Sequence, residues 1–177
     1  AWDSSGEPLR MLGTHTDITV LKQAEESLRI QSACIEAASY SIMITDASGT
    51  ILWVNKAFAT LSGYTRQECT GRNPRELVRS GHHDQRFYRE LWKTILSGEV
   101  WRGEIQNRRK DGTVYPENMT ITPVIESGGR ITHFIAIKHD ISEERKREKQ
   151  LDESQQRLSI AVSAGQVGLW SWDIAQD

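Results

Sequence analysis

The side chains that enzymes use for chemistry occur in this chain, but their spacing indicates no catalytic site. The sequence contains no glycine-rich phosphate loop, no nucleophile elbow and no kinase or cyclase motif. Serine, histidine and aspartate residues are present, yet no spacing marks three of them as a triad. The two cysteines, Cys34 and Cys69, lack the spacing of metal ligands, and so do the histidines around His83. We therefore predict that this part of the chain is not an enzyme.

Asn107 is the polar residue whose surroundings point most directly to ligand binding. Side chains on the expected strand Trp101–Arg109 alternate between two faces, so Asn107 shares one face with Trp101, Gly103 and Ile105. Either this set or its complement faces the interior. A buried amide needs hydrogen-bond partners. A ligand can supply them, or the backbone of a nearby turn can, and both interpretations stay open.

Periodicity and turn residues predict the elements that position Asn107. Helical patterns are expected at Thr19–Ala38, Lys56–Leu61, Thr65–Cys69 and Asp84–Leu96. Strand patterns are expected at Ser41–Thr45, Thr50–Asn55, Trp101–Arg109, Val114–Ile125 and Thr132–Asp140. Because two strands precede the helices of this region and three follow them, we predict an α+β fold. One five-stranded antiparallel sheet would carry helices on one face.

The first helix carries a coiled-coil pattern. Its apolar residues alternate in steps of three and four, with Gln31 in the one polar place, and they are Leu21, Ala24, Leu28, Ile35 and Ala38. A more charged helix is expected at Glu143–Leu158, with a weaker seam at Leu151 and Leu158. We predict that both helices are signalling linkers, and that at least the first pairs with its copy in a parallel homodimer.

An internal repeat predicts that the chain is cut from an array of modules. The segment from Gly6 to Thr19 matches the segment from Gly129 to Ser142 without a gap, and both end in Asp-Ile-Thr or Asp-Ile-Ser. A period near 123 residues suits tandem domains rather than a solenoid. The expected boundaries are the last strand of a preceding module at 1–18, a linker helix at 19–38, one complete module at 39–142, a linker helix at 143–158 and the start of a following module at 159–177.

Composition and charge argue against several classes of partner. Hydrophobic residues make up 37% and charged residues 26% of the 177 residues, and the net charge is −2. This charge gives no reason to expect nucleic acid or an anionic membrane as a partner. No apolar run approaches the ~20 residues that span a bilayer, and the sparse cysteines fit a reducing compartment. We expect a cytoplasmic location and no membrane contact by this part of the chain.

Residues 41–142 resemble the PAS domains of bacterial sensor proteins. Six blocks carry the resemblance in order: Ile44-Thr45-Asp46, Val54-Asn55-Lys56-Ala57-Phe58, Leu61-Ser62-Gly63-Tyr64, Gly71-Arg72-Asn73-Pro74-Arg75, Asn107-Arg108-Arg109-Lys110-Asp111-Gly112 and Asp140-Ile141-Ser142. Within the family, His83-Asp84, Leu91-Trp92 and Asn107 resemble the flavin-holding domains of nitrogen-fixation and methane-oxidation redox regulators. Very similar PAS modules precede histidine kinases and the GGDEF and EAL domains that make and break cyclic di-GMP, so such an output domain is expected.

The resemblance implies a cavity between the helices and the last three strands that holds a flavin, FAD rather than FMN. Asn107 would pair with the pyrimidine edge of the flavin, and Trp92 would stack on its rings. Asn118 resembles the second flavin-binding asparagine of the light-sensing LOV branch. Asn73 and Arg75 match LOV positions near the ribityl chain and the phosphate. These residues, with Ile105, are the expected binding residues.

Two residues depart from the LOV pattern. LOV photochemistry needs a cysteine where this chain has Pro74, so a cysteinyl–flavin adduct is excluded at that position. Lys138 replaces the LOV glutamine that hydrogen-bonds the flavin. An inward Lys138 would stabilise an anionic reduced flavin, whereas an outward one would be an ordinary solvated lysine. The departures favour the sensing of redox state or oxygen over the sensing of blue light.

Two other interpretations stay open. Haem-binding PAS domains ligate the iron through a histidine on this helix, often in a His-Asp pair, and His83-Asp84 is such a pair. The resemblance also allows a cofactor-free dimerisation or small-ligand module, in which Trp92 belongs to the core. In each case we expect Asp140 to cap or tether the end of the last strand, where the signal would pass into the helix that follows.

Overall fold

The computed structural model describes residues 4–5 and 16–165, and the chain divides into two compact units, Ala1–Ala37 and Ala38–Asp177. The first unit contains the helix α1 (Thr19–Ala37), which has no buried residue. The carboxylate of Asp17 accepts the backbone N–H of Thr19 at 2.8 Å and so satisfies one free donor at the start of the helix. The helix predicted at 19–38 is therefore present.

The second unit is built on one antiparallel sheet. Its strands are β1 (Ser41–Asp46), β2 (Ile51–Val54), β3 (Trp101–Arg108), β4 (Val114–Ile125) and β5 (Ile131–Asp140). They lie in the order β2-β1-β5-β4-β3, so the last strand of the chain occupies the centre of the sheet. Each pair of neighbours is antiparallel. The predicted α+β fold with a five-stranded antiparallel sheet is confirmed.

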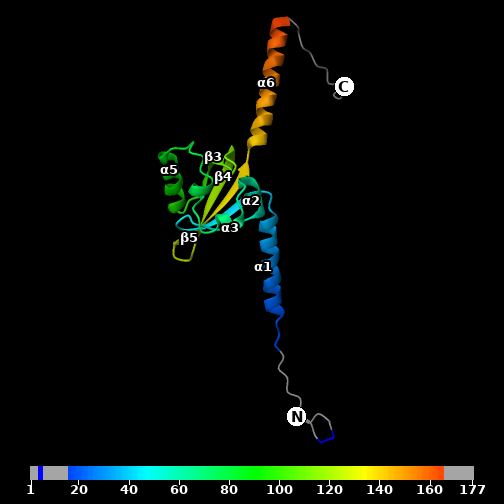
Figure 1. Cartoon of the computed structure of the whole chain (residues 1–177), viewed down its shortest axis with the longest axis vertical. Helices are drawn as coiled ribbons and strands as arrows, with labels where there is room; N and C mark the ends of the chain where they lie inside the picture. Colours follow the sequence, from blue (N-terminus) through cyan, green and yellow to red (C-terminus); the bar gives the residue numbers. More distant parts are fainter. Residues whose placement is uncertain (1–3, 6–15, 166–177) are drawn as a thin grey trace, which may run out of the picture. The chain divides into compact units, whose positions relative to one another are not determined.

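Short helices connect the second strand to the third. They are α2 (Lys56–Ser62), α3 (Arg66–Cys69), α4 (Pro74–Leu77) and α5 (Gln85–Leu96), and α5 lies beside β3 and β4 (Figure 1). Side-chain oxygens of Asn55, Thr65, Asn73 and Asp84 cap them by accepting backbone N–H groups. The sequence analysis missed α4, although Asn73 followed by Pro74 is a helix-start signal.

The core lies between the sheet and these helices. The inward positions of the strands meet apolar side chains of α2 and α5, and the buried set includes Met43, Val54, Phe58, Leu91, Ile95, Ile105, Met119, Ile121, Phe134 and Ala136. Burial of this apolar surface is the main favourable contribution to folding. It also fixes the register of the strands, because a shift by one residue would turn the apolar side chains of a strand to the other face.

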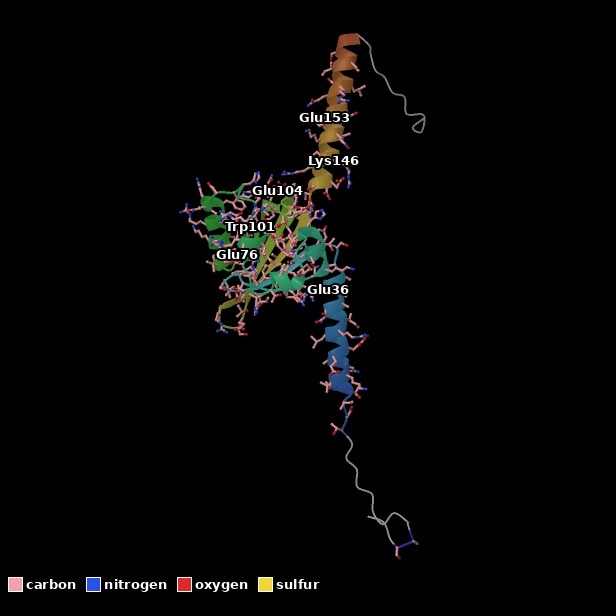
Figure 2. All side chains as sticks on the ribbon, viewed as in Figure 1. Glu36, Glu76, Trp101, Glu104, Lys146 and Glu153 are labelled. Carbon is pink, nitrogen blue, oxygen red and sulfur yellow. The ribbon has the colours of Figure 1, made fainter. Side chains whose placement is uncertain are left out.

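The chain leaves the sheet directly into α6 (Ser142–Gly165), which extends past the predicted end at 158. The carboxylate of Asp140 accepts the backbone N–H of Ser142 at 2.8 Å and its hydroxyl at 2.6 Å. Lys146 and Glu153 project from α6, while Glu104 lies on the sheet side near the start of the helix (Figure 2). The expected capping role of Asp140 therefore agrees with the geometry.

Several expectations lie outside the described residues. The last strand of a preceding module was predicted at 1–18, and the structure does not describe most of these residues. The start of a following module was predicted at 159–177, and most of that segment also lies outside the described range. The described part of that second segment continues α6 to Gly165. Within residues 4–5 and 16–165, no helix combines the length and the apolar character that crossing a bilayer requires.

Asn55 is a buried polar residue that joins β1 to α2, which makes it a test of the architecture. It is 1% exposed, and its side-chain oxygen accepts the N–H groups of Ile42 and Phe58 while its amide donates to the carbonyl of Tyr40. Asn55→Ala would leave these buried groups without partners and remove the cap of α2. We expect a loss of about 2–4 kcal/mol in the free energy of unfolding.

Urea denaturation monitored by circular dichroism measures this loss. Asn118→Ala is the matched control, because Asn118 is an exposed asparagine of β4 and its truncation should change stability by less than about 0.5 kcal/mol. Equal midpoints for Asn55→Ala and the unmutated protein would contradict the role assigned to Asn55.

Candidate functional site

A cavity lies between the sheet and the helices α4 and α5. Its volume is about 130 Å³, and it is open to solvent on one side. Its walls are mostly apolar and come from all strands except β2. The lining residues are Met43, Thr45, Gly49, Asn73, Pro74, Arg75, Val78, Arg79, Tyr88, Leu91, Trp92, Ile95, Ile105, Asn107, Met119, Ile121, Phe134, Ala136 and Lys138. Most small-molecule sites are concave and mainly apolar in this way.

One end of the cavity is polar and fully buried. Asn107 on β3 and Lys138 on β5 both line the cavity, and each is 3% exposed. Between them on β4 lies Glu117, which is 0% exposed. Its Oε1 oxygen accepts a hydrogen bond from Nδ2 of Asn107 at 2.6 Å and lies 3.2 Å from Nζ of Lys138. The buried ammonium is thus balanced by a buried carboxylate, which is the condition under which such charges persist in a core.

The second oxygen of Glu117 lies near the hydroxyl of Tyr115, and a hydrogen bond between these two side chains contributes to the raised pKa of Tyr115. Oε2 is buried, and no donor among the described residues reaches it within 3.5 Å at a favourable angle. The neighbouring Tyr115 is 3% exposed, and burial first, then the negative charge of Glu117, raises the pKa of its hydroxyl well above the usual range. The phenol therefore stays protonated beside the carboxylate.

Strand alternation explains which residues enter the site. On β3 the inward set contains Ile105 and Asn107, in agreement with the first of the two expected faces. On β4 the inward positions include Tyr115, Glu117 and Met119, which leaves Asn118 exposed on the opposite face. The structure thus differs from the expectation for Asn118, because a shift of one residue along a strand reverses the face. Glu117 occupies the inward place, and sequence reasoning did not identify it.

The remaining predicted residues line the cavity as expected. Asn73, Arg75, Trp92 and Lys138 are all part of its wall, and Lys138 points inward rather than to solvent. Asn73 also caps α4, because its side-chain oxygen accepts the N–H of Arg75 at 3.1 Å. The side-chain oxygen of Asn73 is therefore already engaged in a hydrogen bond.

The aromatic wall is held in place by close packing. The ring of Trp92 meets that of Phe134 edge to face, with 5.8 Å between centroids. Gly49 permits this position, because a Cβ atom there would come within 2.9 Å of the Trp92 ring, and its φ of +86° also favours glycine. The hydroxyl of Tyr88, another lining residue, is buried and has no hydrogen-bond partner among the described residues. Arg79 covers the Tyr88 ring at 4.5 Å.

His83 lies outside the cavity lining. Its Nε2 accepts the backbone N–H of Gln106 at 2.9 Å, and its ring stacks on Phe87 with centroids 4.1 Å apart. Burial, and next the nearby His82, lower the pKa of His83, so its imidazole is held neutral. Because the Nε2 lone pair is engaged in this hydrogen bond, the geometry disfavours His83 as a haem ligand. The described residues contain no group of three or more side chains suited to a metal ion.

A continuous set of contacts joins the polar end of the cavity to the start of α6. The guanidinium of Arg109 lies 4.2 Å over the Tyr115 ring and forms an ion pair with Asp140 at 2.6 Å. Burial opposes ionisation of Asp140, but hydrogen bonds from Ser142 and Arg109 outweigh it and lower the pKa of this carboxyl. The Asp140 carboxylate thus contacts both Arg109 and the first turn of α6.

Comparisons with known proteins agree with this architecture. The chain is 38% identical over 108 residues to a nitrogen fixation regulatory protein of Klebsiella oxytoca, a match that covers 61% of this chain and 22% of that protein. It is 32% identical over 100 residues to the aerotaxis receptor of Escherichia coli strain K12, covering 56% and 19%. The chain therefore spans about a fifth of the length of these relatives.

A solved structure and a family model support the same assignment. The PAS domain of an HTR-like protein from Haloarcula marismortui superposes with a TM-score of 0.59 at 26% identity, covering 71% of this chain and all of that one. A model of the PAS domain matches residues 39–143, which spans the sheet, the connecting helices and the polar end of the cavity. Because this match covers more than half of the chain, the chain belongs to the PAS domain family.

Proposed function

We propose that the module binds a flavin and senses redox state or oxygen through it. The observation that carries this proposal is a cavity that joins apolar walls to one buried polar end, where Asn107 and Lys138 line the wall and both contact Glu117. A flavin likewise has apolar and polar parts. Its flat ring faces suit apolar walls, and its pyrimidine edge offers hydrogen-bond donors and acceptors. The proposed binding residues are Asn107, Trp92, Asn73, Arg75, Lys138 and Ile105, and Glu117 supports Asn107 and Lys138 in the place expected for Asn118.

The cavity also has the energetic character of a ligand site. Apolar wall surface that stays in contact with water is unfavourable, and a bound ligand would cover it. The buried hydroxyl of Tyr88 adds a polar group without a partner at the same wall. A bound ligand would offset both costs. These features support an occupied cavity over a cofactor-free spacer.

The arginines at the cavity support a ligand with phosphate groups. Arg75 and Arg79 both line the wall, and guanidinium groups bind phosphate through paired hydrogen bonds. A phosphate-bearing flavin fits this charge better than riboflavin does. We propose FAD rather than FMN, in line with the redox-sensing PAS domains that the sequence resembles.

Redox chemistry fits the residues better than photochemistry does. When bound, a flavin supplies reversible two-electron reduction with a change of charge or protonation at its ring edge. Pro74 lines the cavity where a light-sensing domain would need a thiol. Lys138 and Asn107 face the cavity with donors, while the carboxylate of Glu117 balances the charge of Lys138. The chain therefore holds the groups that would respond to reduction.

The response would pass to α6 through the contacts that begin at Glu117. A change in how Asn107 and Lys138 share Glu117 would alter the environment of Tyr115, on which Arg109 rests. Arg109 in turn holds Asp140 at the start of α6. The proposed output is a shift between two states of this helix, biased by the different interactions of each redox state. A histidine kinase or a diguanylate cyclase/phosphodiesterase domain in the same polypeptide, in the cytoplasm, would receive it.

We also propose that the linker helices pair in a homodimer. The seam residues Leu21 and Leu28 of α1 are 59% and 65% exposed in the single chain, and Ile35 is 41% exposed. A row of exposed apolar side chains at heptad spacing is typical of a coiled-coil contact. A second copy of the same helix is the occupant that this spacing fits.

The first test is the visible spectrum of the purified protein and of Asn107→Ala. We expect the two-banded absorption of oxidised flavin in the unmutated chain, and a roughly 5- to 100-fold weaker flavin affinity in Asn107→Ala. The variant removes a polar partner worth ~1–3 kcal/mol. Asn118→Ala, on the exposed face, is the control and should keep its flavin. A colourless protein that takes up no added FAD would overturn the proposal, and a sharp Soret band would indicate haem.

Hydrogen exchange tests the route to α6. We compare the oxidised and the dithionite-reduced protein and expect changed protection at the cavity and in the first turns of α6. In Asp140→Ala the cavity should still respond while α6 no longer does, because the contacts to Arg109 and Ser142 are gone. Asp152→Ala, at an exposed site farther along α6, should behave like the unmutated chain. Changes confined to the cavity in the unmutated protein would contradict the route.

Sedimentation tests the homodimer. The unmutated chain should sediment as a dimer at high concentration, and Leu28→Glu should shift it toward the monomer because a charge would enter the seam. Glu26→Gln, outside the seam on the same helix, should leave the dimer intact. A monomeric unmutated chain at every concentration would rule the dimer out.

A further inference from the structure

The loop between α4 and α5 forms part of the cavity wall and lies along the outer edge of the sheet. We call residues 78–84 of this loop the strap. Its first two residues, Val78 and Arg79, line the cavity. The backbone N–H of Arg108 on β3, an edge strand, donates to the carbonyl of Val78 at 2.7 Å, and Arg79 pairs with Asn107 in an isolated bridge. The start of the strap is therefore joined to β3 by backbone groups.

Farther along the strap, side chains make the contacts with β3. The hydroxyl of Ser80 donates to the backbone carbonyl of Gln106 and accepts the N–H of His82 at 3.2 Å. The Nε2 atom of His83 accepts the backbone N–H of Gln106 at 2.9 Å. Both backbone groups of Gln106 are thus engaged by side chains of the strap, at an edge where another strand could otherwise pair.

The hydrogen bond of His83 requires a neutral imidazole. Nε2 accepts only while the ring proton is on Nδ1, and a protonated ring would set one N–H against another. Burial, and next the nearby His82, lower the pKa of His83, while Asp84 acts in the opposite direction. The lowering effects are the larger ones. The surroundings of the ring within the strap therefore favour the form that the hydrogen bond needs.

Two other elements pack against the His83 ring. From α5 the rings of Phe87 and Tyr88 lie beside it, with centroids 4.1 and 6.4 Å away. From β3 it meets the backbone N–H that it accepts, and the charged residues on either side of that position are Glu104 and Arg108. The ring is held mainly by aromatic packing, so protonation would remove the bond to β3 while leaving the ring in place against α5.

We propose that His83 is a positioning residue that holds the strap against β3 while it is neutral, and that its protonation releases the strap. In the held state Arg79 stays in the cavity wall, with its guanidinium 4.5 Å over the Tyr88 ring. Release moves this part of the wall away and lets a ligand enter or leave. The inference rests on the proposed function in one respect, because it takes the cavity as the ligand site.

The direction of the pH effect follows from the held state. Its His83 has a pKa below the ordinary value of 6.5, so the held strap binds a proton less readily than the released strap does. The held state keeps its full stability well above about pH 6.5 and loses stability as the pH falls below that value. Acid therefore opens the wall and neutral solution closes it.

Amide exchange at Gln106, measured by NMR on the 177-residue chain without added ligand, tests this role of His83. We expect the protection factor, which corrects for the intrinsic pH dependence of exchange, to fall roughly 3- to 10-fold from about pH 7.5 to about pH 5.5, because one hydrogen bond is lost. The amide of Ala136, in the centre of the sheet, should keep its protection and so shows that the fold stays intact.

Three variants separate the titration of His83 from its packing. His83→Gln places an uncharged acceptor near the position of Nε2, so Gln106 should stay protected at both pH values. His83→Phe keeps a ring against Phe87 without an acceptor, so protection should be low at both. His82→Gln, at the exposed neighbour, should respond to pH as the unmutated chain does. A protection factor that is the same at both pH values in the unmutated chain, or an equal pH response in His83→Gln, would overturn the role of His83.

Release of added FAD, followed by flavin fluorescence, tests the opening of the cavity. The dissociation rate should rise roughly 3- to 10-fold more in acid for the unmutated chain than for His83→Gln. Equal acid responses of the two chains would show that the strap does not control the cavity, which would overturn the inference while flavin binding stands. A chain that binds no FAD would overturn the proposed function, and the exchange at Gln106 would still decide whether His83 holds the strap.

Discussion

The ion pair between Glu117 and Lys138 is the interaction on which the site depends. Both side chains are almost fully removed from water, and their charged atoms are 3.2 Å apart. Desolvating two charges costs several kcal/mol for each, and their attraction offsets this only when other hydrogen bonds complete the geometry. Asn107 supplies one such bond. An apolar pair of similar volume often stabilises a core as well as a buried ion pair does, so stability alone does not explain this pair, and we propose a role in ligand binding for it.

The same strands that carry the ion pair also carry the route out of the domain. Lys138 and Asp140 lie two positions apart on the central strand β5, and Tyr115 and Glu117 are spaced in the same way on β4. The backbone N–H of Ile141 donates to the carbonyl of Pro116 at 3.1 Å, which fixes the end of β5 against β4 next to the site. A change at the closed end of the cavity thus arises within a few residues of the first turn of α6, without a separate relay element.

Particular residues show how far sequence reasoning reached into the site. Side chains on β3 alternate between two faces, so Ile105 and Asn107 share one face. Because Ile105 is apolar, it indicated that this face is the buried one. On β4 two polar residues, Glu117 and Asn118, stand side by side, so hydrophobic pattern alone favoured neither. Resemblance then favoured the asparagine, and the register between strands placed the glutamate inside. The position of Lys138 had been left open for the same reason, since a lysine can face either way.

The sequence by itself determined the five strands, most of the helices, one antiparallel sheet and the family, because these follow from periodicity, turn residues and short motifs. Only the tertiary structure decided which polar side chains meet. Asn107, Glu117 and Lys138 come from three strands whose pairing brings residues far apart in the chain to one point. Charge pairing in a core depends on distances of a few ångströms and on the absence of water. Neither quantity is set by local sequence, so the buried carboxylate became visible only when the strands were aligned.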